Sequence, residues 1–192
     1  MKKVNRRWKR IKSRLVYQNP WIKLWEDKVI RPDGKEGIYG YLEKPTGVFV
    51  IAYSEKNKSI FLLRQSRYPI QKTVFELPAG VTGSGEILSE AKRELKEETG
   101  LEAKKWVNLG SFFVAPGHET TKAEVFLASQ LYKNKVLVEN QEGDEAIQKI
   151  IEVKVKDLHK IIQQGKIKCG ITLASLILFL TKPKSTQDSK IR

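Results

Sequence analysis

The sequence predicts an α/β (α+β) protein, built as an α/β/α sandwich with a mixed sheet and with additional antiparallel strands at the N-terminus. Strand-like segments separated by turn signals fill roughly residues 14–68. A helical repeat of apolar residues follows at 87–99, and further strand-like segments lead into helices near the C-terminus. The chain has 192 residues, of which 40% are hydrophobic, so we expect one sizeable core.

The first segment, residues 1–14, is strongly basic and is predicted to be a solvated arm. It holds eight Lys or Arg residues and no acid, in a chain whose net charge is +14. Binding of nucleic acid or another polyanion is the less favoured alternative for such a run. No apolar region typical of a signal peptide follows it.

The cysteine count and the length of the apolar runs bear on where the protein is located in the cell. The single cysteine, Cys169, excludes an intrachain disulfide within these 192 residues and favours a reducing, cytoplasmic setting. The longest apolar run, residues 171–180, is too short to span a bilayer. We therefore expect no membrane partner.

Residues 15–45 are predicted to form N-terminal strands, with a turn at the PDGK sequence of residues 32–35. Residues 46–182 are predicted to form the main domain, which begins with the strand-like segments GVFVIAYS and SIFLLRQSRYP. The last residues, 183–192, are predicted to be a frayed tail.

The helix at 87–99 is the clearest local prediction. Leu88, Ala91, Leu95 and Thr99 recur at helical spacing, and Gly100 is a typical stop signal. A glycine-rich loop, VTGSG, precedes the helix. The segments WVNLGSFFV and AEVFLASQL then predict strands, VENQEGDEA an acidic loop, IIEVKV a strand, and DLHKIIQQ and TLASLILFL helices.

The predicted helix gathers acidic side chains on one face. Residues three and four apart share a helix face, so Glu94, Glu97 and Glu98 project together. Like charges at these spacings cost roughly 0.2 to 0.5 kcal/mol per pair. A hard divalent cation such as Mg²⁺ would remove this repulsion, because it prefers carboxylate oxygens and phosphates. The alternative is an ordinary charged helix face.

This helix and the loop before it resemble the signature of the Nudix hydrolases. The signature runs Gly, five residues, Glu, seven residues, then Arg-Glu-apolar-x-Glu-Glu-x-Gly-apolar. Gly80 lies at the required distance from Glu86, and residues 93–101 fit the second half throughout. Only six residues, ILSEAK, separate Glu86 from Arg93. Either Glu86 keeps its role near the helix start, which we prefer, or Gly85 occupies its place.

The resemblance covers roughly residues 15–180. The sequences RQSRYPIQKTVFELPAG and NPWIKLWEDKVIRPDGKEGIYGYLEK are similar to those of the ADP-ribose and nucleoside-diphosphate-sugar pyrophosphatase branch. Pro116 lies sixteen residues after Gly100, where this branch carries a proline that marks its substrate class. Many members have a glutamate near the position of Thr121, whereas this chain has Glu119 and Glu124.

The resemblance implies a set of metal ligands and one supporting cation. Mg²⁺ is the expected ion and Mn²⁺ the alternative. Glu94 and Glu98 would be the principal ligands, with Glu97 sharing or bridging ions and Arg93 holding a glutamate in position. The implied metal set is Ala79 (through its carbonyl), Glu86, Glu94, Glu97 and Glu98.

The resemblance also implies substrate contacts and a general base. Arg67 is expected close to the diphosphate, although structural pairing is the alternative for it, and Gly80 lets the backbone approach the phosphates. The base is a glutamate of the acidic loop, with Glu145 preferred and Glu142 second. The implied catalytic set is Glu145, Glu142, Glu97 and Arg93, and the implied substrate-binding set is Arg67, Arg64, Gly80 and Pro116.

The expected function is Mg²⁺-dependent hydrolysis of the diphosphate bond of ADP-ribose or a related nucleoside diphosphate sugar. The products would be a nucleoside monophosphate and a sugar phosphate. The branch implies a homodimer whose residues 15–45 take part in dimerisation. Two alternatives are a catalytically weakened module that binds nucleotides or RNA, and a hydrolase of capped RNA or dinucleoside polyphosphates.

Overall fold

The computed structural model describes residues 7–83, 85–133 and 147–182. By their contacts these residues belong to two compact units. The N-terminal unit holds the described residues within Met1–Thr46 and Phe113–Lys122, and the main unit holds those within Gly47–Phe112 and Ala123–Arg192.

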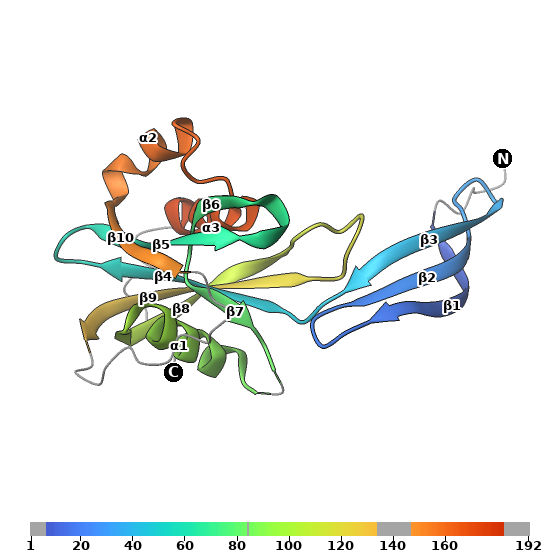
Figure 1. Cartoon of the computed structure of the whole chain (residues 1–192), viewed down its shortest axis with the longest axis horizontal. Helices are drawn as coiled ribbons and strands as arrows, with labels where there is room; N and C mark the ends of the chain where they lie inside the picture. The colour runs from blue at the N-terminus through green and yellow to red at the C-terminus, as the bar shows by residue number, and fades with distance from the viewer. Residues whose placement is uncertain (1–6, 84, 134–146, 183–192) are drawn as a thin grey trace. The chain divides into compact units, whose positions relative to one another are not determined.

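The N-terminal unit is an antiparallel sheet with the order β1-β2-β3 (Figure 1). Its strands are β1 (Lys9–Gln18), β2 (Lys23–Ile30) and β3 (Glu36–Glu43). The turn expected at residues 32–35 joins β2 to β3, and Gly34 adopts a φ of 86° there, which a side chain would disfavour. Strand β1 begins at Lys9, inside the segment assigned from the sequence to a basic arm.

The main unit is built on a mixed sheet with the order β10-β5-β4-β9-β8, with β6 added to β5 and β7 added to β4. Strand β4 runs parallel to β9 and antiparallel to β5 and β7. The strands are β4 (Gly47–Ser54), β5 (Ser59–Arg67), β6 (Lys72–Glu76), β7 (Ala79–Val81), β8 (Leu101–Phe113), β9 (Lys122–Lys133) and β10 (Ile147–Lys154).

Helices cover both faces of this sheet (Figure 1). Alternate residues of β4 point to opposite faces, so Val48 and Val50 pack against Ala91 and Leu95 of α1. Ile51 packs on the other face, in the cluster that contains α3 residues. The helical elements are α1 (Ile87–Thr99), α2 (Leu158–Gln163), α3 (Gly170–Thr181) and the short 3₁₀ helices η1 (Tyr68–Ile70) and η2 (Val155–Asp157). The prediction of an α/β/α sandwich with a mixed sheet is confirmed.

The ends of α1 follow the sequence signals. The helix ends where Gly100 adopts a φ of 68°, and the Gly100 N–H donates to the Lys96 carbonyl at 2.8 Å. Its N-cap residue is Glu86, whose backbone is extended. In the part of the chain that the structure describes, no helix combines the length and the apolarity needed to cross a membrane.

Candidate active site

Helix α1 holds two of its acidic residues, Glu94 and Glu98, against strand β7. Ala91 and Leu95 pack in the apolar cluster between α1 and the sheet. This packing fixes the rotation of α1 about its own axis. Helical spacing then directs Glu94 and Glu98 inward, where both are buried, with exposed fractions of 6% and 2%. Carboxylates are rarely buried unless they have hydrogen-bond or ion-pair partners. The role of Glu94 and Glu98 therefore depends on the groups that contact them.

Glu98 is fixed by the backbone of β7. The Ala79 N–H donates a hydrogen bond of 2.7 Å to Oε2 of Glu98. This contact joins the end of α1 to the strand that carries the predicted Ala79 carbonyl ligand. It satisfies one lone pair of a buried carboxylate and fixes the side-chain direction.

Glu94 fills the space that a side chain at residue 80 would need. A Cβ atom placed on Gly80 would lie only 1.8 Å from Oε1 of Glu94. The φ of Gly80 is not positive, so this glycine is required by the close approach of Glu94 and not by backbone conformation. The role that the family resemblance implies for Gly80, in which it lets the backbone approach the phosphates, stays a prediction.

Arg93 pairs with three glutamates of α1. Its guanidinium pairs with Glu94 and Glu97 at short range and with Glu90 at 3.0 Å. Burial acts to lower the pKa of Arg93, but the hydrogen bond to Glu90 and the charges of Glu94 and Glu97 outweigh it and raise the pKa. Arg93 therefore stays charged and offsets part of the glutamate repulsion.

The oxygen atoms of the predicted ligands are chemically suited to a hard divalent cation. Carboxylate oxygens and a strand-end carbonyl are the ligands that Mg²⁺ and Mn²⁺ prefer. Among the residues described, no group of three or more carboxylate, thiol or imidazole side chains is already gathered around one point. Arg93 contacts Glu94 and Glu97 directly, so an ion shared by these two glutamates would compete with the guanidinium for their oxygens.

The two predicted substrate arginines lie on opposite faces of the sheet. Arg67 donates from Nε at 2.8 Å and from a terminal nitrogen at 2.6 Å to Oε2 of Glu76. Alternation along β5 puts Arg67 on the face covered by α1, and Arg64 on the face that carries Ile60 and the α3 cluster. They therefore do not converge on one group.

Other predicted residues have less defined places. Glu86 is exposed at the start of α1, and its side chain makes no capping hydrogen bond. Glu142 and Glu145, the candidate bases, lie outside the described residues. Pro116 belongs to the N-terminal unit, where it helps to line a cavity of about 530 Å³.

Glu124 is a buried acidic residue whose place the sequence analysis did not foresee. Gly80 pairs with Val48 on β4, and Val48 pairs with Glu124 on β9, so all three lie in one row on the α1 face. Asn108 donates to Glu124 at 3.4 Å. The available signal was a single charge inside the apolar run AEVFLA, but its face depends on strand register.

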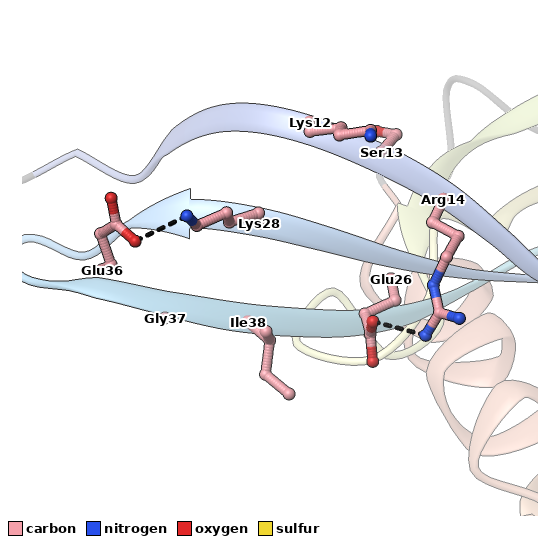
Figure 2. Close-up of a pocket in the computed structure, with 8 residues that line it drawn as sticks. All are labelled: Lys12, Ser13, Arg14, Glu26, Lys28, Glu36, Gly37 and Ile38. Carbon is pink, nitrogen blue, oxygen red and sulfur yellow. Dashed lines mark hydrogen bonds and ion pairs between the residues drawn. The ribbon is translucent and has the colours of Figure 1, made fainter.

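Figure 2 shows a part of the N-terminal sheet where basic and acidic side chains form ion pairs. Arg14 of β1 pairs with Glu26 at 2.8 Å, and Lys28 pairs with Glu36 at 2.7 Å. Part of the basic character of the N-terminal segment is therefore neutralised by acidic residues of the same sheet.

Comparison with known proteins agrees with this geometry. The family model of the NUDIX domain matches residues 43–168, which contain β7, α1 and the glutamate cluster. The chain belongs to the Nudix family. A second family model, the nucleoside diphosphate sugar hydrolase N-terminal domain, matches residues 8–42. Nudix hydrolases generally use a divalent metal.

Relatives of this Nudix hydrolase include an ADP-ribose pyrophosphatase and a methanol dehydrogenase activator. It is 33% identical over 184 residues to the ADP-ribose pyrophosphatase of Bacillus subtilis (strain 168), covering 95% of this chain and 97% of that protein. It is 32% identical over 165 residues to a methanol dehydrogenase activator of Bacillus methanolicus, covering 80% and 89%. A crystal structure of an ADP compounds hydrolase shares the fold, with a TM-score of 0.74, 19% identity and coverage of 90% and 92%. The Nudix hydrolase prediction, in its ADP-ribose and nucleoside-diphosphate-sugar pyrophosphatase branch, is confirmed.

Proposed function

We propose that this Nudix hydrolase cleaves the diphosphate bond of ADP-ribose or a related nucleoside diphosphate sugar, with Mg²⁺ as its metal. The products are a nucleoside monophosphate and a sugar phosphate. The observation that carries the proposal is the pair of buried carboxylates, Glu94 and Glu98, held against Gly80 and Ala79 of strand β7. Full-length similarity to an ADP-ribose pyrophosphatase supports the substrate class.

In this proposal Glu94, Glu97, Glu98 and the Ala79 carbonyl hold the metal, and Glu86 is a further candidate ligand. When bound, Mg²⁺ supplies positive charge that neutralises the diphosphate oxygens and assists the attack of water. Mn²⁺ would fit the same oxygen donors. Arg93 positions the glutamates, because its planar guanidinium contacts two of them at once.

Substrate recognition on the α1 face is assigned to Arg67. Its side chain is 45% exposed although it is paired with Glu76, so it has free surface for a phosphate oxygen. Arg64 lies on the opposite face and does not join this contact. The proton of the attacking water passes to a glutamate of the acidic loop, with Glu145 the first candidate and Glu142 the second.

We also propose that the N-terminal sheet mediates a homodimer and contributes to substrate binding. Strand β1 is exposed along its whole length and carries large apolar side chains, including Ile11, Leu15 and Tyr17. Exposed apolar surface of this kind marks interaction sites. A cytoplasmic location stays a prediction that rests on the single cysteine.

The direct test is a substrate panel of ADP-ribose, GDP-mannose, UDP-glucose, NADH, diadenosine polyphosphates and capped RNA, incubated with Mg²⁺ and resolved by mass. We expect nucleoside monophosphate and sugar phosphate from at least one nucleotide sugar. Hydrolysis of capped RNA or dinucleoside polyphosphates alone would contradict the proposed substrate class. Binding of RNA without hydrolysis of any compound would instead favour the binding module.

A further inference from the structure

The loop between β8 and β9 is fastened to the end of β3 within the N-terminal unit. The Leu42 N–H donates to the His118 carbonyl at 2.9 Å, and the Thr120 N–H donates to the Leu42 carbonyl at 3.0 Å. Leu42 and Glu119 consequently form an isolated parallel bridge. The backbone of residues 118–120 thus continues the edge of the N-terminal sheet.

Side chains reinforce this attachment. Lys44 forms an ion pair with Glu119, whose side chain is only 8% exposed, while that of Lys44 is 33% exposed. The Thr121 hydroxyl donates to the same Glu119 oxygen at 3.0 Å. The Tyr39 hydroxyl donates to the Gly117 carbonyl at 2.9 Å. A nearly buried carboxylate with a lysine partner is a strong positional constraint, because loss of the partner would leave its charge poorly solvated.

The fastened loop forms one wall of the 530 Å³ cavity. Residues 116–120 line it on one side, and side chains of the sheet, among them Tyr39, Tyr41 and Asp27, line the other. Any shift of the loop relative to β3 would therefore change the width of this cavity. The ion pair lies at the junction between the loop and the sheet that form the two sides.

We propose that Lys44 and Glu119 form a latch that fixes the width of this cavity and thereby determines which nucleoside diphosphate sugars bind. The inference rests on the proposed function, in which the N-terminal sheet contributes to substrate binding. Lys44 and Glu119 are positioning residues: they act through the loop, and they belong to a different unit from the glutamates of α1. The latch should consequently affect substrate binding and selectivity, with little effect on turnover.

The test compares steady-state kinetics of Glu119→Gln and Lys44→Met with those of the wild type. We expect KM for the preferred nucleotide sugar to rise about tenfold while kcat stays within about twofold, because a contact that acts only on binding changes KM alone. The ratio of kcat/KM values between ADP-ribose and GDP-mannose should also change. The double exchange Lys44→Glu with Glu119→Lys should restore much of the wild-type KM, which simple loss of packing would not allow.

The matched control is Glu36→Gln, which breaks the exposed Lys28–Glu36 pair on the same sheet without touching the loop (Figure 2). It should leave KM and selectivity unchanged. Should a single latch variant fail to fold, Thr121→Val, which removes only the hydroxyl donor to Glu119, should raise KM in the same direction by a smaller factor.

Hydrogen exchange separates failure of the latch from failure of the proposed function. The amides of Leu42 and Thr120 should exchange faster in Glu119→Gln than in the wild type, because their bonds close the loop. If the wild type hydrolyses no nucleotide sugar, the proposed function fails. Unchanged amide exchange at Leu42 and Thr120 in Glu119→Gln would then overturn the proposed latch as well. In an active enzyme, latch variants with wild-type KM and selectivity would overturn it.

Discussion

Gly80 and Glu94 are in close contact, and the carboxylate of Glu94 occupies the position where a side chain at residue 80 would place its Cβ atom. The contact connects strand β7 to the middle of α1 and buries the Glu94 side chain beside the backbone. A glycine at residue 80 is thus a steric condition for the inward orientation of Glu94. A substitution of Gly80 therefore tests whether the inward orientation of Glu94 matters for the reaction.

Gly80→Ala should displace Glu94 without unfolding the protein, because residue 80 has no left-handed backbone conformation. A carboxylate moved by about 1 Å from a catalytic position can cost on the order of 100-fold in rate. We expect a loss of that size in kcat, measured on ADP-ribose at saturating Mg²⁺. Gly83→Ala is the control, since a Cβ atom there meets nothing within 4 Å. Equal activity in both variants would contradict a role for Glu94 orientation.

Arg93→Lys should weaken metal binding. A lysine ammonium cannot reproduce the fork that contacts Glu94 and Glu97 together. Loss of such a supporting contact typically costs about 10- to 100-fold in metal affinity. Isothermal titration with Mn²⁺ should show the drop, and Lys92→Ala, an exposed change on the same helix, should not. Tighter metal binding in Arg93→Lys would mean that the guanidinium chiefly competes with the ion.

Arg67→Ala and Arg64→Ala should behave differently because the two side chains lie on opposite faces of β5. We expect KM to rise about tenfold in Arg67→Ala, which loses a phosphate contact worth roughly one charge-assisted hydrogen bond. Arg64→Ala should keep the wild-type KM. The same kinetic assay on ADP-ribose measures both. Equal effects of the two changes would place the diphosphate somewhere other than the α1 face.

Glu43 should make a pH-dependent contribution to stability. The Lys23 ammonium and the Trp25 indole N–H, at 2.9 and 2.8 Å, hold the pKa of this carboxyl below its ordinary 4.5 against the opposing effect of burial. A lowered folded-state pKa stabilises the fold above pH 4.5, and the stabilisation is lost as pH falls through the lowered value. Denaturant unfolding of wild type and Glu43→Gln should therefore diverge near neutral pH and converge in acid. A difference that is constant with pH would contradict this.

The local part of the site was predictable and the long-range part was not. Helical spacing alone places Glu94 and Glu98 on one face of α1, and Gly100 ends the helix, because both effects operate within a few residues. The position of Glu124 depends on the parallel pairing of β4 with β9, between residues far apart in the chain. No local pattern specifies that register, so the Glu124 position could only be seen in the fold.

The structure of the N-terminal region also depends on long-range contacts that the sequence does not reveal. Composition suggested a solvated arm up to residue 14, because charge runs are usually exposed. Cross-strand partners override composition here, since Arg14 and Ser13 contact Glu26 and Asp27 of β2. The attachment of Glu119 to Lys44 is also a long-range contact, and the sequence indicated only that an acidic residue occurs near Thr121. By contrast, the opposite faces of Arg64 and Arg67 follow from the alternation of any strand.

Glu98→Gln tests the central claim most directly, because it removes one charge and keeps an acceptor for the Ala79 N–H. Turnover of ADP-ribose should be measured against Mg²⁺ concentration, with Glu36→Gln as the control and thermal unfolding as the check on folding. Since metal-assisted charge stabilisation is worth several kcal/mol, we expect a folded protein with kcat lowered by at least about 100-fold. Undiminished Mg²⁺-dependent cleavage by Glu98→Gln would contradict the assignment of the reaction to the buried glutamates of α1.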